Sequence, residues 1–381
     1  MDTIKGTRFP EALLGYVLDI LDVHTYTIKD HGETVVFTGR LREDSGSAFE
    51  RLQARLHPLG YQALLRRDRG QDIIVTTPTP EVGKVSRPWI NILLFATTIV
   101  TTLMAGAFLE RQPRPWASLD ALLAGAPFAI AILSILGTHE LGHYVVARHY
   151  GIKVTLPYFI PFFPFFPFGI GTMGAVIRMK SPMTSRKALF DVGLAGPIAG
   201  LIIAIPVLTI GLLQSDLVPA HSMGRGMTLL LGKPLLFKAV SRLVLGPLPE
   251  NVRVALSPIA FAGWVGLFVT AMNLLPTGQL DGGHIAYAVW GRGHRFLAQT
   301  TFVGLIAMGI VPFFLNLLPG VEPVPGWSGW LIWALLLSAF GLRHPPALDD
   351  VTPLTGPRII AGILAIVLLI TLITPVPFSI Q

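Results

Sequence analysis

The sequence contains no cysteine and few charged residues. Because no thiol is present, disulfides and thiolate metal ligands are excluded, and any zinc site must use histidine and carboxylate side chains. Only 13% of the residues are charged and 52% are apolar, whereas an average soluble protein has roughly 25% charged residues. This composition is typical of a protein that crosses a membrane several times.

The net charge of +7 is unevenly distributed along the chain. Residues 1–87 carry equal numbers of acidic and basic side chains, so the whole excess lies in the apolar remainder. Basic loops next to apolar segments favour the anionic cytoplasmic face of a lipid bilayer. No basic stripe interleaved with aromatic residues is present, so a nucleic-acid partner is not expected.

The N-terminal part, residues 1–80, is predicted to be a small soluble α+β domain. Its alternating and helical apolar patterns predict these elements: a helix at Pro10–Leu21, strands at Thr25–Lys29 and Thr34–Thr38, a helix at Ser47–Leu56, and strands at Tyr61–Leu65 and Asp72–Thr76. Residues 81–87 are expected to be a linker. We expect this domain to be cytoplasmic and regulatory.

Long apolar runs follow Pro88, and roughly 20 apolar residues suffice to cross a bilayer. The candidate spans are Ile90–Leu109, Leu122–Ala147, Ala188–Leu213, Ile259–Leu275, Phe296–Leu317, Trp330–Leu342 and Ile359–Ile373. The sequence therefore predicts a polytopic α-helical membrane protein with six or seven transmembrane helices. Residues 88–295 are expected to form the functional core, and residues 296–381 to add further C-terminal helices.

Short basic loops predict the orientation of these helices. The loops expected to share the cytoplasmic side contain Lys84, Arg87, Arg148, Lys153, Arg178, Lys180, Arg186, Lys187, Arg292, Arg295 and Arg343. The N-terminus has neither the apolar core of a secretory signal nor the Arg/Ser-rich pattern of a transit peptide. We therefore expect a multi-pass protein of a prokaryotic plasma membrane.

One segment between the predicted spans is not helical. Pro157–Phe168, PYFIPFFPFFPF, has too many prolines for a helix, and Gly169–Met179 alternates like a strand. Two interpretations remain open: a surface hairpin anchored by aromatic side chains at the interface, or a re-entrant β-hairpin. In the second, an edge strand would pair with an unwound segment of another protein.

The chemistry of the chain centres on His139-Glu140-Leu141-Gly142-His143, which lies inside a predicted span. Histidines at positions i and i+4 of a helix lie on one face and can hold one metal ion, and Glu140 can stand beside a water bound to it. Ionisable groups in hydrocarbon are costly and usually mark function. The motif therefore predicts an intramembrane zinc site.

A zinc site needs a third ligand. The segment Asn273-Leu-Leu-Pro-Thr-Gly-Gln-Leu-Asp281-Gly-Gly ends another predicted span and offers Asp281. Pro276 would interrupt the helix, and the two glycines would allow close backbone packing. Two alternatives remain: Asp281 could be the N-cap of the next helix, or His284, one turn later, could be the third ligand.

Other polar and small residues in the spans have structural interpretations. Asp191 could take part in a proton relay or contact Lys187, one helical turn before it, and the structural pair is the favoured interpretation. Gly193, Gly196 and Gly200 are predicted to allow close helix packing.

The two motifs together, HELGH and NLLPTGQLDGG, resemble the site-2 protease family of intramembrane zinc metalloproteases. The segments FGIGTMGAVIRMKSP and ALFDVGLAGPIAG are similar to the subgroup that contains the plastid EGY-type proteases and their bacterial relatives. The likeness covers roughly residues 88–300. It implies one zinc ion held by His139, His143 and Asp281, and Glu140 as the catalytic acid/base. It also implies that Asn273 orients the substrate or stabilises the oxyanion.

The resulting hypothesis is an intramembrane zinc endopeptidase that cuts transmembrane substrates near the cytoplasmic face. Glu140 would accept a proton from the zinc-bound water and pass it to the leaving nitrogen. Two rival functions are a membrane-anchored zinc protease that acts on soluble segments and a non-catalytic membrane metal-binding protein. The substrate and the oligomeric state do not follow from the sequence.

Overall fold

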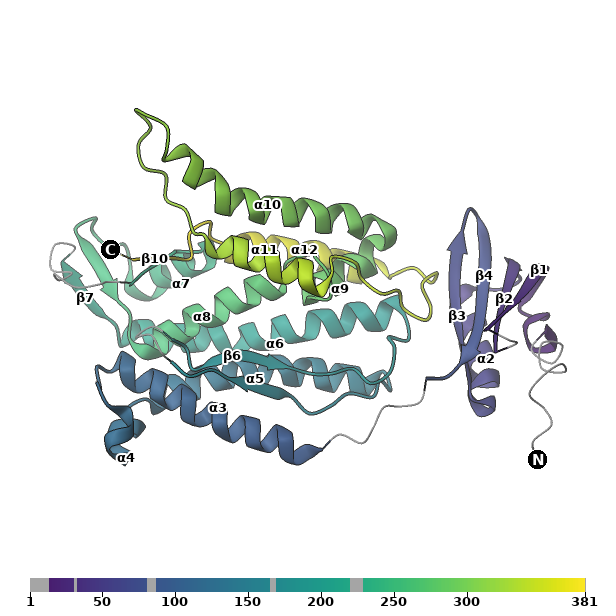
Figure 1. Ribbon diagram of the computed structural model, residues 1–381, viewed down its shortest axis with the longest axis horizontal. Helices are drawn as coiled ribbons and strands as arrows, with labels where there is room; N and C mark the ends of the chain where they lie inside the picture. The colour runs from purple at the N-terminus through teal and green to yellow at the C-terminus, as the bar shows by residue number, and fades with distance from the viewer. Residues whose placement is uncertain (1–13, 31–32, 81–86, 165–168, 220–228, 381) are drawn as a thin grey trace.

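The computed structural model describes residues 14–380 apart from 31–32, 81–86, 165–168 and 220–228. A small sheet domain lies beyond one end of a group of long helices (Figure 1). Short strand pairs and a short helix lie at the opposite end of that group.

The N-terminal domain is a four-stranded antiparallel sheet with a helix packed on one face. Its elements are β1 (Leu21–Lys29), β2 (Thr34–Leu41), α2 (Ser45–Leu56), β3 (Tyr61–Asp68) and β4 (Gln71–Pro78), and the strand order is β1-β2-β4-β3. All four predicted strands are present and longer than expected. The predicted helix Pro10–Leu21 begins outside the described residues; it is helical at 14–17, and Leu21 already belongs to β1.

Ten helices follow among the described residues. They are α3 (Pro88–Leu109), α4 (Leu119–Leu123), α5 (Ala126–His149), α6 (Arg186–Leu213), α7 (Leu235–Leu245), α8 (Pro258–Asn273), α9 (Asp281–Trp290), α10 (His294–Leu315), α11 (Gly329–Phe340) and α12 (Gly356–Leu372). Three short antiparallel pairs connect them: β5 (Tyr158–Pro161) with β6 (Thr172–Val176), β7 (Asp216–Pro219) with β9 (Val252–Ala255), and β8 (Leu229–Leu231) with β10 (Phe378–Ile380).

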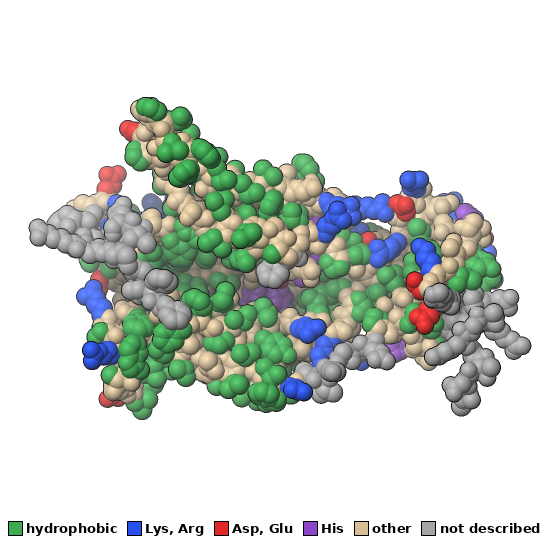
Figure 2. All heavy atoms as spheres, in the orientation of Figure 1, with side chains coloured by type: hydrophobic (Ala, Val, Ile, Leu, Met, Phe, Trp, Pro, Cys, Tyr) green, Lys and Arg blue, Asp and Glu red, His purple; other side chains and the backbone are tan. Residues whose placement is uncertain are grey.

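The long apolar helices indicate a membrane protein. Among the described residues, four segments are long and apolar enough to cross a bilayer: α3, α5, α6 and the combined segment of α9 and α10. The shorter apolar helices α8, α11 and α12 coincide with the other predicted spans. Figure 2 shows apolar side chains covering the helical part of the visible face, with Lys and Arg side chains mainly at its two ends.

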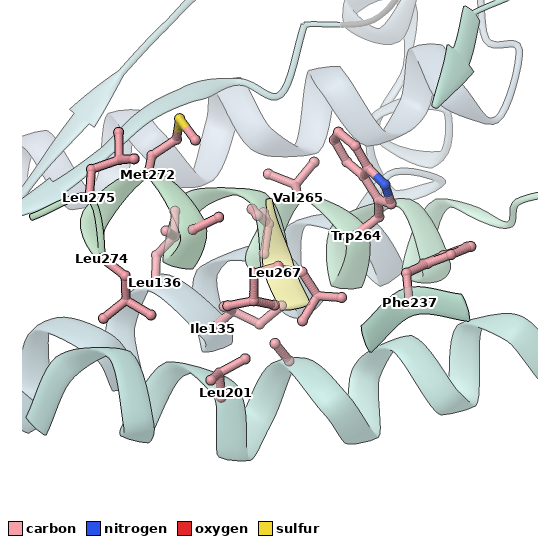
Figure 3. Close-up of a cluster of buried hydrophobic side chains, with 14 of the residues drawn as sticks. Ile135, Leu136, Leu201, Phe237, Trp264, Val265, Leu267, Met272, Leu274 and Leu275 are labelled. Carbon is pink, nitrogen blue, oxygen red and sulfur yellow. The ribbon is translucent and has the colours of Figure 1, made fainter. Parts of the chain in front are cut away.

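The core of the helical part is built where α5, α6 and α8 pack against one another. Figure 3 shows Ile135 and Leu136 of α5 and Leu201 of α6 lying against Val265 and Leu267 of α8. All five side chains are buried. This apolar packing fixes the relative positions of the two predicted motifs, since the first lies in the second half of α5 and the second begins at the last residue of α8.

The N-terminal domain contacts the helical part through residues 344–352, between α11 and α12, which we name the strap. Leu65 N of β3 donates a 2.7 Å hydrogen bond to Leu348 O, and Asp350 N donates a 3.0 Å bond to Leu65 O. On its other side, Leu348 N donates a 2.9 Å bond to Met183 O, just before α6. The strap thus lies as an added strand between β3 and the start of α6, and Leu348 is buried in the core of the N-terminal domain.

Candidate metal centre

Helix α5 presents His139, Glu140 and His143 towards the interior of the helical group. Their exposed fractions are 4%, 7% and 7%. The Nε2 atoms of the two histidines are 3.1 Å apart, as expected for an i, i+4 pair on one face of a helix. Figure 2 shows histidine side chains at the bottom of a hollow in the middle of the visible face.

Asp281 reaches the two histidines from the start of α9. Its Oδ2 atom is 3.2 Å from His139 Nε2, and its Oδ1 atom is 3.2 Å from His143 Nε2. The ligand atoms of these three residues all lie within 4.8 Å of one another. The N-cap of α9 is Leu280, so Asp281 is not the capping residue that the alternative interpretation proposed.

The turn between α8 and α9 presents Asp281 because it is tightly packed. A Cβ atom on Gly282 would lie 1.9 Å from Leu274 O, and one on Gly283 would lie 2.4 Å from Gly278 O. A side chain at either position would push α9 away from the turn. The expectation that the two glycines permit close backbone packing is confirmed.

The donor set fits zinc. His143 Nδ1 is 2.7 Å from Val192 O; since a carbonyl only accepts, Nδ1 carries the proton and the lone pair of Nε2 faces the cluster. Asp281 Oδ2 is buried and has no hydrogen-bond partner among the described residues. Two imidazole nitrogens and one carboxylate that converge on one point form the three-ligand set of catalytic zinc sites, which leave the fourth position open.

Two glycines of α6 make room for the histidine rings. A Cβ atom on Gly196 would lie 2.1 Å from His143 Nε2, and one on Gly200 would lie 3.2 Å from His139 Nδ1. The sequence predicted helix packing for these glycines but did not predict that they contact the ligand side chains. The signal was available, because the glycines have the same four-residue spacing as the histidines.

Two further polar groups lie at the cluster. Asn273, the last residue of α8, places its Nδ2 atom 3.2 Å from His139 Nε2. The backbone of Ile177, directly after β6, lies close enough to the Glu140 carboxylate to interact with it. The hairpin β5–β6 therefore ends beside the predicted acid/base.

His284 belongs to a different cluster. Its Nδ1 atom is 2.6 Å from His344 Nε2 of the strap, and it is not among the three residues whose ligand atoms converge. The pKa of His344 is lowered to about 3, mainly because the ring is buried and secondly because His284 lies beside it. His344 is therefore neutral at physiological pH. The Tyr287 hydroxyl donates a 3.0 Å bond to Asp350 Oδ2 of the strap.

Asp191 does not pair with Lys187, so the predicted pair is wrong. Arg358 of α12 binds this carboxylate with two bonds, Nε to Oδ1 at 2.8 Å and Nη2 to Oδ2 at 2.7 Å, and the Tyr150 hydroxyl donates a third. The planar guanidinium matches both carboxylate oxygens at once, which the single ammonium group of Lys187 cannot do.

Comparisons with known proteins agree with this geometry. A family model described as peptidase family M50 matches residues 127–319. The chain is 28% identical over 365 residues to "Probable zinc metalloprotease EGY2, chloroplastic" of Arabidopsis thaliana, covering 91% of this chain and 61% of the relative. It is 29% identical over 421 residues to "Probable zinc metalloprotease EGY1, chloroplastic" of Oryza sativa subsp. japonica, covering 98% and 68%. The chain thus spans less than two thirds of the EGY2 relative. No solved structure matches the chain.

Proposed function

Because the chain belongs to peptidase family M50, the site-2 protease family, we propose that it is an intramembrane zinc endopeptidase. It would hydrolyse peptide bonds in or near the transmembrane segments of other membrane proteins. The resemblance found in the sequence is confirmed by the family match and by the EGY-type relatives. The observation that carries the proposal is the convergence of His139, His143 and Asp281 inside a group of apolar helices.

In this proposal His139, His143 and Asp281 hold one zinc ion per chain. When bound, zinc would lower the pKa of a water molecule and polarise the scissile carbonyl. Val192 O fixes the tautomer of His143, and the two glycines of α6 keep both rings against that helix. These contacts hold the donor atoms in place, and they support affinity for the metal.

Glu140 is the proposed acid/base. It follows the first histidine on the same helix, and the residue is buried. Glu140 would accept the proton of the attacking water and then deliver it to the leaving nitrogen, a role that typically contributes about 10² to 10⁴-fold in rate. Asn273 would donate its amide N–H to the developing oxyanion; one such donor is worth about 3 kcal/mol.

The hairpin β5–β6 is the proposed docking strand for the substrate. Asn91 Nδ2 of α3 donates bonds to Leu156 O and Pro157 O before β5, so α3 covers the β5 side. Strand β6 forms the other edge of this two-stranded sheet. Ile177, the residue after β6, lies beside Glu140. An unwound substrate segment that paired with β6 would carry its carbonyl groups past the acid/base. This interpretation favours a re-entrant hairpin, since irregular backbone at membrane depth is tolerated only against protein or a wet cavity.

Purified protein in proteoliposomes tests the proposed function. We expect it to cut a single-span model substrate within or next to its span, and to leave the soluble part of the same substrate uncut when the span is removed. Products are mapped by mass spectrometry. Equal cleavage of both forms would favour a membrane-anchored protease for soluble segments. Zinc binding without cleavage of either form would favour the non-catalytic alternative.

The orientation proposed is the metal centre towards the cytoplasm of a prokaryotic plasma membrane. The N-terminal domain lies at the end of the helical group where α5 ends and α6 begins (Figure 1). Arg148 lies in the last turn of α5, Lys153 lies shortly after that helix, and Lys187 lies in the first turn of α6. Basic residues at the ends of membrane-spanning helices are the pattern of the cytoplasmic side.

We also propose that the N-terminal domain regulates the site through the strap. The strap is hydrogen-bonded to β3 on one side and to the residues before α6 on the other. It also contacts α9 through His344–His284 and Asp350–Tyr287. Since α9 begins at Asp281, a displaced N-terminal domain would disturb the helix that presents the proposed third ligand.

Leu348→Asp tests this coupling. A charge at this buried position should release the N-terminal domain from the strap, because burying an unpaired carboxylate is costly. We expect faster hydrogen exchange of the amides in Tyr61–Asp68 and a cleavage rate changed several-fold, with zinc content unaltered. Ile28→Asp, on an exposed position of β1, is the matched control and should change neither quantity. A released domain with an unchanged cleavage rate would refute a regulatory role.

A further inference from the structure

A groove runs along the outer face of α5 and α6, away from the metal centre. It encloses about 810 Å³, and its walls include Leu141 and Val145 of α5 and Ile198 and Ile202 of α6, all of which are between 41% and 63% exposed. Its floor is narrow because Gly142 lies against α6, where a Cβ atom would be 2.7 Å from Ala195 O. In a bilayer this face contacts hydrocarbon chains.

The groove lies on the opposite side of α6 from the proposed ligands. Gly196 and Gly200 face the histidine rings, whereas Ala195, Ile198 and Ile202 line the groove. At 100° per residue these two sets fall on opposed faces of one helix. Glu140 and the groove residues Leu141 and Val145 lie on different faces of α5, so a substrate lying in the groove would be separated from Glu140 by the body of α5.

The charged residues of the groove all lie at one end, and that end is net positive. His149 and Tyr150 line it from the end of α5, Lys187 and Asp191 from the start of α6, and Arg358 from α12. The carboxylate of Asp191 is already occupied by Arg358 and Tyr150. Lys187 is exposed, and although it lies near enough to Asp191 to attract it, it forms no ion pair within 4 Å of a carboxylate among the described residues. Two cations against one paired anion leave a site complementary to a negatively charged group.

The dimensions match a membrane lipid. From Lys187 to Ile202 the groove follows 15 residues of α6, or about 22 Å at 1.5 Å per residue. One leaflet of a hydrocarbon core about 30 Å thick measures about 15 Å, so the groove is long enough for an acyl chain and the headgroup attached to it. Tyr150 at the polar end has the position typical of interfacial aromatic residues.

We propose that this groove binds one anionic phospholipid. The phosphate contacts Lys187 and the Arg358 guanidinium, and one acyl chain lies between α5 and α6 over Gly142 and Ala195. The bound lipid fills the crossing of the two helices that carry the proposed histidine ligands and their supporting glycines. The site depends on the membrane location of the helices and not on peptidase activity.

Native mass spectrometry of the full chain in detergent, with phosphatidylglycerol or phosphatidylcholine added, tests the proposal. The wild type should retain one phosphatidylglycerol in preference to phosphatidylcholine. Lys187→Gln should retain it about fivefold less, the factor expected for losing one lysine contact with an anionic headgroup. Lys153→Gln, an exposed lysine on the same side but outside the groove, should behave as the wild type. Val145→Trp, which fills the groove, should reduce retention of phosphatidylglycerol without altering zinc content.

Equal retention of the two lipids by the wild type would overturn the proposal. So would equal loss from Lys187→Gln and Lys153→Gln. Displacement of the lipid by inorganic phosphate alone would assign the polar end to a free anion, and displacement by a single-span peptide would assign the groove to a protein helix. Either result contradicts a lipid site.

Discussion

Glu140→Ala is expected to lose cleavage of a transmembrane substrate by at least about 10³-fold while still binding about one zinc per chain. The carboxylate is the only described acidic group that follows a proposed ligand directly on α5, and Glu140 is not among the three residues whose ligand atoms converge. Removing it should therefore remove proton transfer and leave the metal in place. Cleavage is measured in proteoliposomes, and zinc by elemental analysis of the same preparation.

The matched control for this variant is Glu322→Ala, an exposed glutamate in the connection between α10 and α11. It should retain both zinc and cleavage. If Glu140→Ala retained cleavage, another group would have to move the proton, and the proposed mechanism would be wrong. If Glu140→Ala lost zinc as well, the loss of activity would not separate catalysis from metal binding.

Asp281→Ala is expected to lose nearly all of its zinc, whereas His284→Ala should retain it. Asp281 has a carboxylate oxygen 3.2 Å from each histidine Nε2, and a two-histidine remnant lacks the third ligand of a catalytic zinc site. His284 lies one turn further along α9 and is paired with His344. Both substitutions are in α9. A difference in zinc content between them would therefore show that Asp281 is a ligand, and would not reflect a general disturbance of this helix.

Zinc content of the two variants is measured after purification without chelator, together with thermal unfolding. We expect fewer than about 0.1 zinc per chain in Asp281→Ala and near one in His284→Ala, since two protein ligands hold zinc far less tightly than three. The opposite pattern would make His284 the third ligand. Loss of zinc from both variants with loss of folding would mean that α9 needs both residues to stay in place.

The features that were predictable from the sequence are those set by local geometry. The facing of His139 and His143 follows from helix periodicity alone, and the strands of the N-terminal domain follow from alternation. The turn at Pro276 and the close approach of Gly282 and Gly283 follow from the backbone properties of proline and glycine. The proximity of Asp281 to the histidines was inferred from chemistry, since a zinc site needs a third ligand.

The features that were not predictable depend on contacts between distant segments. Asp191 pairs with Arg358, 167 residues away, and no local pattern favours that partner over Lys187. The strap carries no membrane or catalytic motif, yet it joins β3 to the start of α6. Hydropathy predicted the apolar runs. The length of each helix, however, depends on where its packing ends. Among the described residues, only four segments reach membrane-spanning length.

X-ray absorption at the zinc edge of the purified wild-type protein tests the central claim most directly, because it needs no substitution. The account predicts one zinc per chain, bound by two imidazole nitrogens and a carboxylate oxygen. A spectrum with three imidazoles would place His284 in the site instead of Asp281, and it would contradict the arrangement of ligands on which the proposed function rests.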